Sequence, residues 1–267
     1  MSARFDFSGK RVFVFGGTSG INLGIARSFA SAGANVAVAS RSQDKVDSAV
    51  AELGELGSDA RGYSLDVRDV DAVNSALEQH VNDTGKIDVL VSGAAGNFPA
   101  FANDMSPNGF KSVVDIDLLG SFHVLHSAFP HLKKPGASII NISAPQAFVP
   151  MPMQSHVCAA KAGVDMLTKT LALEWGPAGI RVNSISPGPI ADTEGMRRLA
   201  PTEKLLELTK RSVPLQRLGE ASEIGAAALF LASDSGSYIS GVVLPVDGGW
   251  SVAGASAAAL AMTQQQG

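Results

Sequence analysis

Short apolar runs alternate along the chain with longer stretches in which apolar residues recur at helical spacing. The runs are RVFVF (11–15), NVAVA (35–39), IDVLV (87–91), ASIINI (137–142), IRVNSI (180–185) and VVLPV (242–246), with RGYSL (61–65) as a weaker candidate. Uninterrupted β-branched runs of this kind are typical of parallel strands covered on both faces. The stretches with helical periodicity lie at 20–33, 42–56, 69–84, 107–131, 153–176 and 220–233.

The alternation of strands and helices predicts an α/β fold. Strand, helix and parallel strand connect through right-handed crossovers, so we expect a doubly wound parallel sheet of the Rossmann type with three αβα layers. The length favours a single domain, 1–267, and the irregular segment 188–212 is a candidate substrate-side lid. Ligands of such sheets bind outside the carboxyl ends of the strands, which is where chemistry is expected.

The composition of the chain limits which kinds of molecule the protein is expected to bind. The chain has a net charge of -4 and its 21 basic residues are scattered, which argues against nucleic acid and favours a small-molecule substrate. Cys158 is the single cysteine, so an internal disulfide and a multi-cysteine metal site are excluded, and we expect no metal. The start MSARFDFSGK lacks a signal-peptide pattern, and no apolar run approaches the ~20 residues that span a bilayer. We therefore expect a cytoplasmic protein without a membrane partner.

A glycine-rich loop follows the first predicted strand. RVFVF runs into GGTSGINLG, which places Gly16 and Gly20 at the start of a helix. Glycines let the backbone approach a pyrophosphate, and a helix N-terminus supplies free N–H groups, although glycine-rich loops also occur for purely structural reasons. The loop predicts a dinucleotide site.

The ends of the next two strands bear on the choice of cofactor. The second strand ends at Ser40 and Arg41, where a carboxylate would bind a ribose 2′-hydroxyl, and an arginine there suits a 2′-phosphate. This predicts NADPH rather than NADH, unless Arg41 is only a solvated residue opening a helix. Asp66 follows the third strand and is placed either to accept from an adenine amino group or to cap the next helix.

The motifs GGTSGI, LDV, SGAAGN, AAKAGV and SPGPI together resemble the short-chain dehydrogenase/reductase family over nearly the whole chain. The resemblance implies cofactor-binding roles for residues in the glycine loop, at the strand ends and in the loop after the sixth main strand. These residues are Gly16, Thr18, Ser19, Gly20, Ile21, Ser40, Arg41, Asp66, Val67, Lys161, Pro187, Gly188 and Ile190.

Three positions depart from the family pattern. Asn22 replaces the third glycine of the loop, and we expect it to tolerate unusual backbone angles. Asp117 stands where the family has an asparagine, and Val157 stands where it has the catalytic tyrosine, four residues before Lys161. Finer matches, including AAGNF, DIDLLGSF and PGPIADTEGMRRL, resemble 2,4-dienoyl-CoA reductases of the peroxisomal type, which also lack that tyrosine.

Reduction of a dienoyl thioester needs an oxyanion site and a proton source rather than a phenol. Asn97 can donate an N–H to the thioester oxygen, unless it only shapes a turn. A buried Asp117 must be paired, and Lys161 is the expected partner; together they would hold a water that protonates carbon 2, as the resemblance implies. Ser143 matches the family's serine and orients substrate, or is an ordinary residue at a strand end.

These residues support three functional hypotheses. The leading one is an enzyme that uses NADPH to reduce a 2,4-dienoyl-CoA in the breakdown of unsaturated fatty acids. The alternatives are a carbonyl or enone reductase of the same family, and a non-catalytic NADPH-binding protein. The resemblance also implies a homotetramer built on the helices at 107–131 and 153–176.

Overall fold

The computed structural model describes residues 5–252, and the predicted domain ends and the alanine-rich tail lie outside these residues. Seven parallel strands form one sheet in the order β3-β2-β1-β4-β5-β6-β7. The strands are β1 (Arg11–Phe15), β2 (Asn35–Ser40), β3 (Arg61–Ser64), β4 (Val89–Ser92), β5 (Ser138–Ile142), β6 (Arg181–Pro187) and β7 (Val243–Val246). The Rossmann-type prediction is confirmed, including the weaker strand at 61–65.

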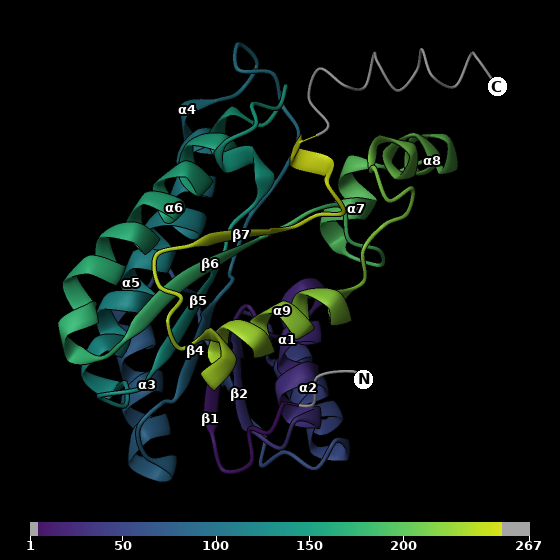
Figure 1. Cartoon of the computed structure of the whole chain (residues 1–267). Helices are drawn as coiled ribbons and strands as arrows, with labels where there is room; N and C mark the ends of the chain where they lie inside the picture. The colour runs from purple at the N-terminus through teal and green to yellow at the C-terminus, as the bar shows by residue number, and fades with distance from the viewer. Residues whose placement is uncertain (1–4, 253–267) are drawn as a thin grey trace.

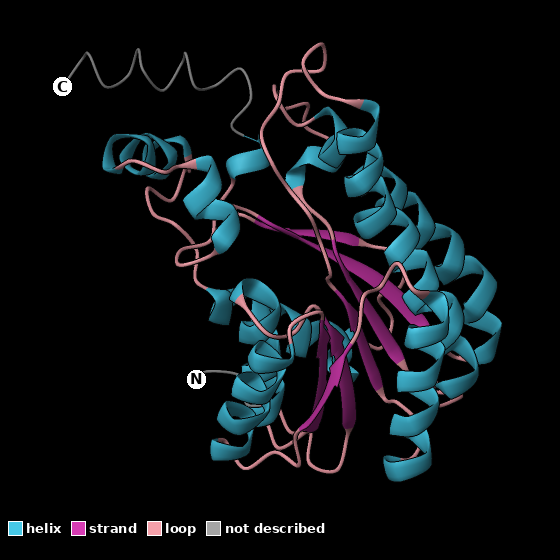
Figure 2. Cartoon of the chain, turned by 180° about the vertical axis from the view of Figure 1, so that it is seen from behind, coloured by secondary structure: helices cyan, strands magenta, loops and turns pink. Residues whose placement is uncertain are grey.

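Helices cover both faces of the sheet, as Figures 1 and 2 show. One face packs against α1 (Gly20–Ser31), α2 (Gln43–Glu55) and α9 (Ala221–Ala232). The other packs against α3 (Val70–Thr84), α5 (Gly120–Ala128) and α6 (Ser155–Trp175). The molecule is therefore the predicted three-layer αβα arrangement.

The central position of β1 in the sheet explains why its sequence does not alternate between apolar and polar residues. Val12 and Val14 face the core that includes α1 and α9, while Phe13 and Phe15 face the core that includes α3 and α5. All four side chains have no solvent exposure. Successive side chains of a strand point to opposite faces, so a sheet covered on both sides needs apolar residues at every position.

The predicted helix at 107–131 is not one α-helix. It consists of α4 (Pro107–Val114), a π-helical turn at Asp115–Leu119, α5, and a 3₁₀ turn at Phe129–His131. Within the π turn the Gly120 N–H donates to the Asp115 carbonyl, five residues earlier. Such a turn accommodates one extra residue in a helix, and apolar periodicity alone does not reveal it. The helix predicted at 153–176 is confirmed as α6.

The irregular segment 188–212 contains two short helices, α7 (Glu194–Leu199) and α8 (Glu203–Ser212). Each begins with a threonine hydroxyl that accepts a backbone N–H, from Thr193 for α7 and from Thr202 for α8. Its role as a lid stays a prediction. Across residues 5–252, no helix has both the length and the apolar character needed to cross a membrane.

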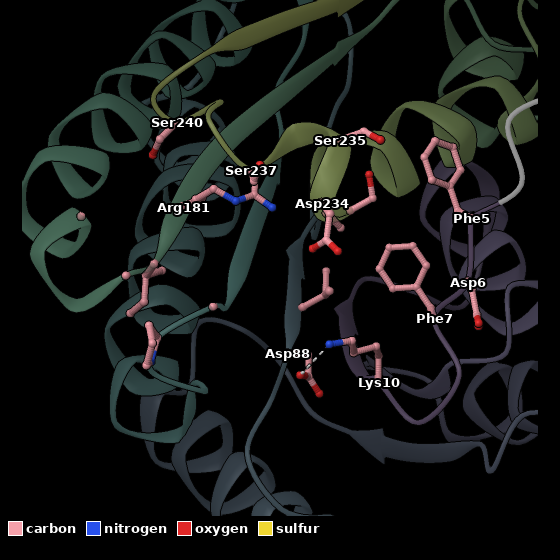
Figure 3. Close-up of a pocket in the computed structure, with 18 of the residues that line it drawn as sticks. Phe5, Asp6, Phe7, Lys10, Asp88, Arg181, Asp234, Ser235, Ser237 and Ser240 are labelled. Atoms are coloured by element: carbon pink, nitrogen blue, oxygen red, sulfur yellow. Dashed lines mark ion pairs between the residues drawn. The ribbon is translucent and has the colours of Figure 1, made fainter.

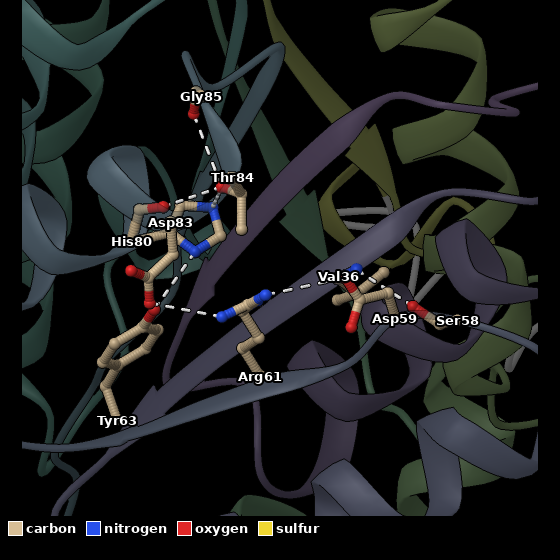
Figure 4. A network of polar contacts seen from close by, with 9 residues as sticks. All are labelled: Val36, Ser58, Asp59, Arg61, Tyr63, His80, Asp83, Thr84 and Gly85. Carbon is tan, nitrogen blue, oxygen red and sulfur yellow. Dashed lines mark hydrogen bonds and ion pairs between the residues drawn. The ribbon is translucent and has the colours of Figure 1, made fainter.

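A buried histidine joins α3 to the sheet (Figure 4). One ring nitrogen of His80 lies 3.3 Å from the Tyr63 hydroxyl and the other lies 3.3 Å from the Thr84 hydroxyl. The ring also packs edge-on against Phe13, with 5.0 Å between ring centroids. Burial lowers the pKa of His80 to about 4, so the imidazole is neutral at physiological pH.

Candidate functional site

A cavity of about 960 Å³ lies at the carboxyl edge of the sheet. Every residue predicted for the site lines it. These are Gly16, Thr18, Ser19, Gly20, Ile21, Ser40, Arg41, Asp66, Val67, Asn97, Asp117, Ser143, Lys161, Pro187, Gly188 and Ile190. The fold therefore gathers residues from widely separated segments of the chain around one space.

A second cavity lies at the amino ends of β1, β4 and β6 (Figure 3). Its charged groups serve the fold: Asp88 pairs with Lys10 and Lys133 at 3.8 and 3.2 Å. Arg181 donates to the carbonyls of Leu231 and Ile239. The first cavity is thus the candidate for chemistry.

The glycine loop forms a tight cradle for a phosphate group. A Cβ added at Gly16 would lie 2.9 Å from the Ala94 nitrogen, so only glycine allows this approach, and its φ of +75° is favourable only for glycine. Ser19 is the N-cap of α1 but its side chain accepts no N–H there. The first N–H groups of α1 are thus left for an anion, and the residues fit a dinucleotide pyrophosphate.

Asn22 plays a different part from the one predicted. It lies within α1 rather than in the loop, and it does not have a positive φ, so tolerance of unusual backbone angles is not its role. Its side-chain amide donates to the Gly93 carbonyl at 2.7 Å. A Cβ at Gly93 would overlap this amide, which shows how closely α1 and the end of β4 meet.

The ends of β2 and β3 flank one side of the cavity. Arg41 is exposed, and within residues 5–252 no carboxylate forms a salt bridge with it, which leaves a guanidinium for a phosphate. Asp66 binds Arg68 through both carboxylate oxygens, and this partner lowers the pKa of Asp66. The capping alternative for Asp66 is wrong, because Asp69 is the N-cap of α3.

Asp117 and Lys161 meet at the floor of the cavity. The Lys161 Nζ lies 3.3 Å from Asp117 Oδ2, and the two side chains are 6% and 1% exposed, respectively. Nζ also donates to the Ile142 carbonyl at 2.9 Å. The predicted pairing is confirmed. The two groups touch directly, so a water that binds both would lie beside the pair rather than between them.

The loop that carries Asn97 is fixed by partners on both sides. The Gly96 N–H donates to Asp117 Oδ1 at 2.7 Å, and the Asn97 carbonyl accepts from Arg198 of α7 at 2.9 Å. Phe98 packs edge-on against His156, with 4.6 Å between ring centroids. His156 is fully buried, and neither ring nitrogen has a hydrogen-bond partner within residues 5–252.

Two further buried polar groups lie near the pair, Ser143 in the lining of the cavity and Asp165 outside it. The Ser143 hydroxyl is buried at the end of β5 and has no hydrogen-bond partner in the described part of the chain. Asp165, one helical turn after Lys161, is also buried, and burial raises its pKa. Asp165 was missed in the sequence, where its i, i+4 spacing from Lys161 was the available signal.

Val157 lines the cavity one turn before Lys161 and is buried. It offers no proton, so acid–base chemistry in this cavity must come from other groups. Two buried atoms of the cavity, Asn97 Oδ1 and Ser143 Oγ, have no hydrogen-bond partner within residues 5–252, whereas Asp117 Oδ2 has the Lys161 ammonium at 3.3 Å. Buried polar atoms without partners are costly, and substrate or water supplies the missing contacts in active sites.

Comparison with known proteins agrees with this geometry. Residues 16–251 match the family model described as Enoyl-(Acyl carrier protein) reductase. The chain belongs to the short-chain dehydrogenase/reductase family. Members of this family use a nicotinamide dinucleotide, in agreement with the cradle at the start of α1. The fold agrees too: a short-chain dehydrogenase from Bacillus anthracis superposes with a TM-score of 0.82 at 38% identity, covering 91% of this chain and 96% of that one.

Two relatives of this chain within the family are named as 2,4-dienoyl-CoA reductases. The chain is 45% identical to a peroxisomal 2,4-dienoyl-CoA reductase, (3E)-enoyl-CoA-producing, of Arabidopsis thaliana, over 90% of this chain and 84% of the relative. It is 39% identical to a probable 2,4-dienoyl-CoA reductase, (2E)-enoyl-CoA-producing, of Bacillus subtilis, over 90% and 96%. One of these names is peroxisomal and the other is not, so the cytoplasmic location stays a prediction.

Proposed function

We propose that the protein is an NADPH-dependent 2,4-dienoyl-CoA reductase that acts in the degradation of unsaturated fatty acids. The single observation that carries the proposal is the buried Asp117–Lys161 pair beside Val157, a proton-handling pair in a site without a phenol. The identity of 45% to a relative of that name supports it.

The side chains that line the cavity have distinct roles in the proposed reaction. When bound, the dinucleotide would supply hydride to carbon 5 of the dienoyl group. The charge then moves to the thioester oxygen, where the Asn97 side chain donates a hydrogen bond. One such donor contributes roughly 3 kcal/mol to catalysis. Ser143 orients the thioester, and Lys161 also binds the ribose hydroxyls of the nicotinamide.

The Asp117–Lys161 pair holds the water that gives its proton to carbon 2, and the Lys161 ammonium returns a proton to the hydroxide that is left, before solvent reprotonates the amine. Proton addition at carbon 2 leaves the double bond between carbons 3 and 4, which is a 3-enoyl product. Proton addition at carbon 4 would leave a 2-enoyl product. The names of the two relatives differ on this point, so the position of the product's double bond tests the assignment of the proton donor.

NADPH is proposed over NADH because Arg41 stands at the end of β2 without a salt-bridge partner in residues 5–252. A 2′-phosphate supplies the anion that such a guanidinium binds. A carbonyl reductase is disfavoured because Val157 cannot protonate an alkoxide.

The test follows NADPH oxidation with 2,4-hexadienoyl-CoA and identifies the product by NMR. Turnover to a 3-enoyl-CoA is the expected result. Tight NADPH binding without turnover of any dienoyl thioester, ketone or enone would instead assign the protein to non-catalytic dinucleotide binding. Turnover of a ketone or enone alone would favour the carbonyl or enone reductase.

We further propose a homotetramer assembled through α4, α5 and α6. Large apolar side chains are exposed on these helices and the π turn, where a monomer would leave them in water. They are Phe110, Leu119, Phe122, Met166 and Leu173. Light scattering after size-exclusion chromatography is expected to give four chains per particle, and Phe122→Ser is expected to shift the mass downward.

A further inference from the structure

The two rims of the active-site cavity differ in charge. One rim consists of α7 and α8, which stand apart from the top of α4 in Figure 1. Eight of the 19 positions from 194 to 212 are charged, five basic and three acidic. The other rim is formed by the loops after β4 and β5; the first carries one charged residue, Asp104, between Ser92 and α4, and the second carries none between Ile142 and α6.

This second rim exposes large apolar side chains. Phe101 is 53% exposed, Phe148 is 50% exposed and Met153 is 36% exposed. The two loops that carry them are joined, because the Ala100 N–H donates to the Met153 carbonyl at 3.0 Å. We name these three side chains, Phe101, Phe148 and Met153, the apolar rim.

The three side chains of the apolar rim do not themselves line the cavity, but their neighbours along the chain do. Asn97 lines the cavity four residues before Phe101, and Met151 lines it between Phe148 and Met153. Met153 has a φ of +66°, a left-handed conformation that is uncommon for a residue other than glycine.

We infer that the apolar rim is the docking surface for the fatty acyl tail of the thioester, the part beyond the conjugated carbons. This inference rests on the proposed function and deepens it. A long-chain acyl-CoA is an amphiphile with a phosphate-bearing head and an apolar tail. Residues 194–212 carry five basic and three acidic side chains, a net charge of +2 that suits the phosphates of the head, and the apolar rim suits the tail, so the two rims would orient the substrate.

The inference predicts that the rim affects long chains and not short ones. A six-carbon dienoyl group ends one carbon past the diene, whereas a ten-carbon group has four further carbons to place on the rim. The rim is therefore a determinant of chain-length preference, and the ratio of kcat/KM for the two substrates isolates its effect.

The experiment measures kcat/KM for 2,4-hexadienoyl-CoA and 2,4-decadienoyl-CoA in the wild type, Phe148→Ser and Phe101→Ser. Tyr238→Ser is the matched control, because Tyr238 is a fully exposed aromatic residue that precedes β7, at the amino edge of the sheet. We expect each rim variant to lower the decadienoyl value about fivefold, the effect of one or two methylene groups leaving an apolar surface, with hexadienoyl turnover changed by less than about twofold.

Equal loss on both substrates, or an unchanged ratio in both rim variants, would overturn the inference while leaving the proposed function intact. If the rim were a contact between copies of the chain, the variants would change the mass measured by light scattering and affect both substrates alike. A wild type that turns over neither substrate would overturn the proposed function and this inference with it.

Discussion

Lys161 Nζ and Asp117 Oδ2 lie 3.3 Å apart, with both side chains almost completely removed from solvent. The ammonium comes from α6 and the carboxylate from the π turn between α4 and α5. Neither group would be stable there alone, because an unpaired buried charge costs several kcal/mol. Function and folding therefore depend on the same contact, and variants must be chosen to separate the two.

Asp117→Asn is expected to lower kcat by about 10²-fold, within the usual range for a group in proton transfer. The asparagine oxygen still accepts from the Gly96 N–H, so the loop keeps its anchor. The measurement is NADPH oxidation with hexadienoyl-CoA. Asp115→Asn is the control two residues away, since Asp115 pairs with the exposed Lys111. A loss of kcat in both variants would contradict the assignment.

Asn97→Ala is expected to lower kcat by about 10²- to 10³-fold and to leave the Kd for NADPH unchanged, because the amide contacts charge that develops only during reaction. Asn103→Ala in the same loop is the control, since its amide donates to the neighbouring Asp104. Steady-state kinetics and fluorescence titration with NADPH provide the two readouts. A rise in the NADPH Kd without a change in kcat would show that Asn97 serves the cofactor instead.

Arg41→Ala is expected to weaken NADPH binding by about 10- to 100-fold, the equivalent of one hydrogen bond to a charged group, and to leave NADH binding unchanged. The comparison variant is Arg27→Ala, whose guanidinium pairs on the surface with Glu52 of α2. Titrations with the two dinucleotides check the result. Equal weakening of both cofactors would remove the 2′-phosphate assignment.

Asn22→Ala is expected to lower the free energy of unfolding by about 1–3 kcal/mol, because the Gly93 carbonyl loses its amide partner in a buried position. NADPH binding should weaken as well, since this hydrogen bond ties the start of α1 to the end of β4. Thermal unfolding with and without NADPH measures both effects, with the exposed Ser31→Ala on the same helix as reference. An unchanged Tm would show that the contact is dispensable.

The stability of the wild type is expected to fall as pH drops from about 6.5 towards 4. His80 is neutral in the folded state down to a pKa of about 4, whereas in the unfolded chain it binds a proton below its ordinary pKa of 6.5. The unfolded state therefore gains protons first, at a cost of at most about 1.4 kcal/mol per pH unit.

His80→Gln removes this titration and should flatten the dependence of Tm on pH between 7 and 5, measured at one protein concentration. The glutamine variant is expected to be less stable than the wild type at pH 7, because it loses the packing against Phe13. Parallel curves for the two proteins would mean that other groups dominate the acid response.

The sheet and the composition of the cavity were predictable from the sequence because they depend on local patterns. Apolar runs predict covered strands, and parallel strands bring their carboxyl ends to one edge. The partner of Asp117 was predictable as well, since a buried carboxylate requires a cation. Contacts made through single side chains over long separations were not predictable. The Asn22 amide reaches Gly93, and Arg198 reaches the Asn97 carbonyl 101 residues away, with no local signal for either.

The π turn at Asp115–Leu119 places the segments on its two sides out of phase. An α-helix turns by about 100° per residue, so deletion of a single residue here would close the bulge and rotate everything on one side of it by that angle. Either the Asp117 carboxylate would move away from the Lys161 ammonium, or α5 would no longer pack against α3. The position of the Asp117 carboxylate therefore depends on the number of residues in the π turn. An insertion or deletion at this point is expected to be far more damaging than one in a surface loop.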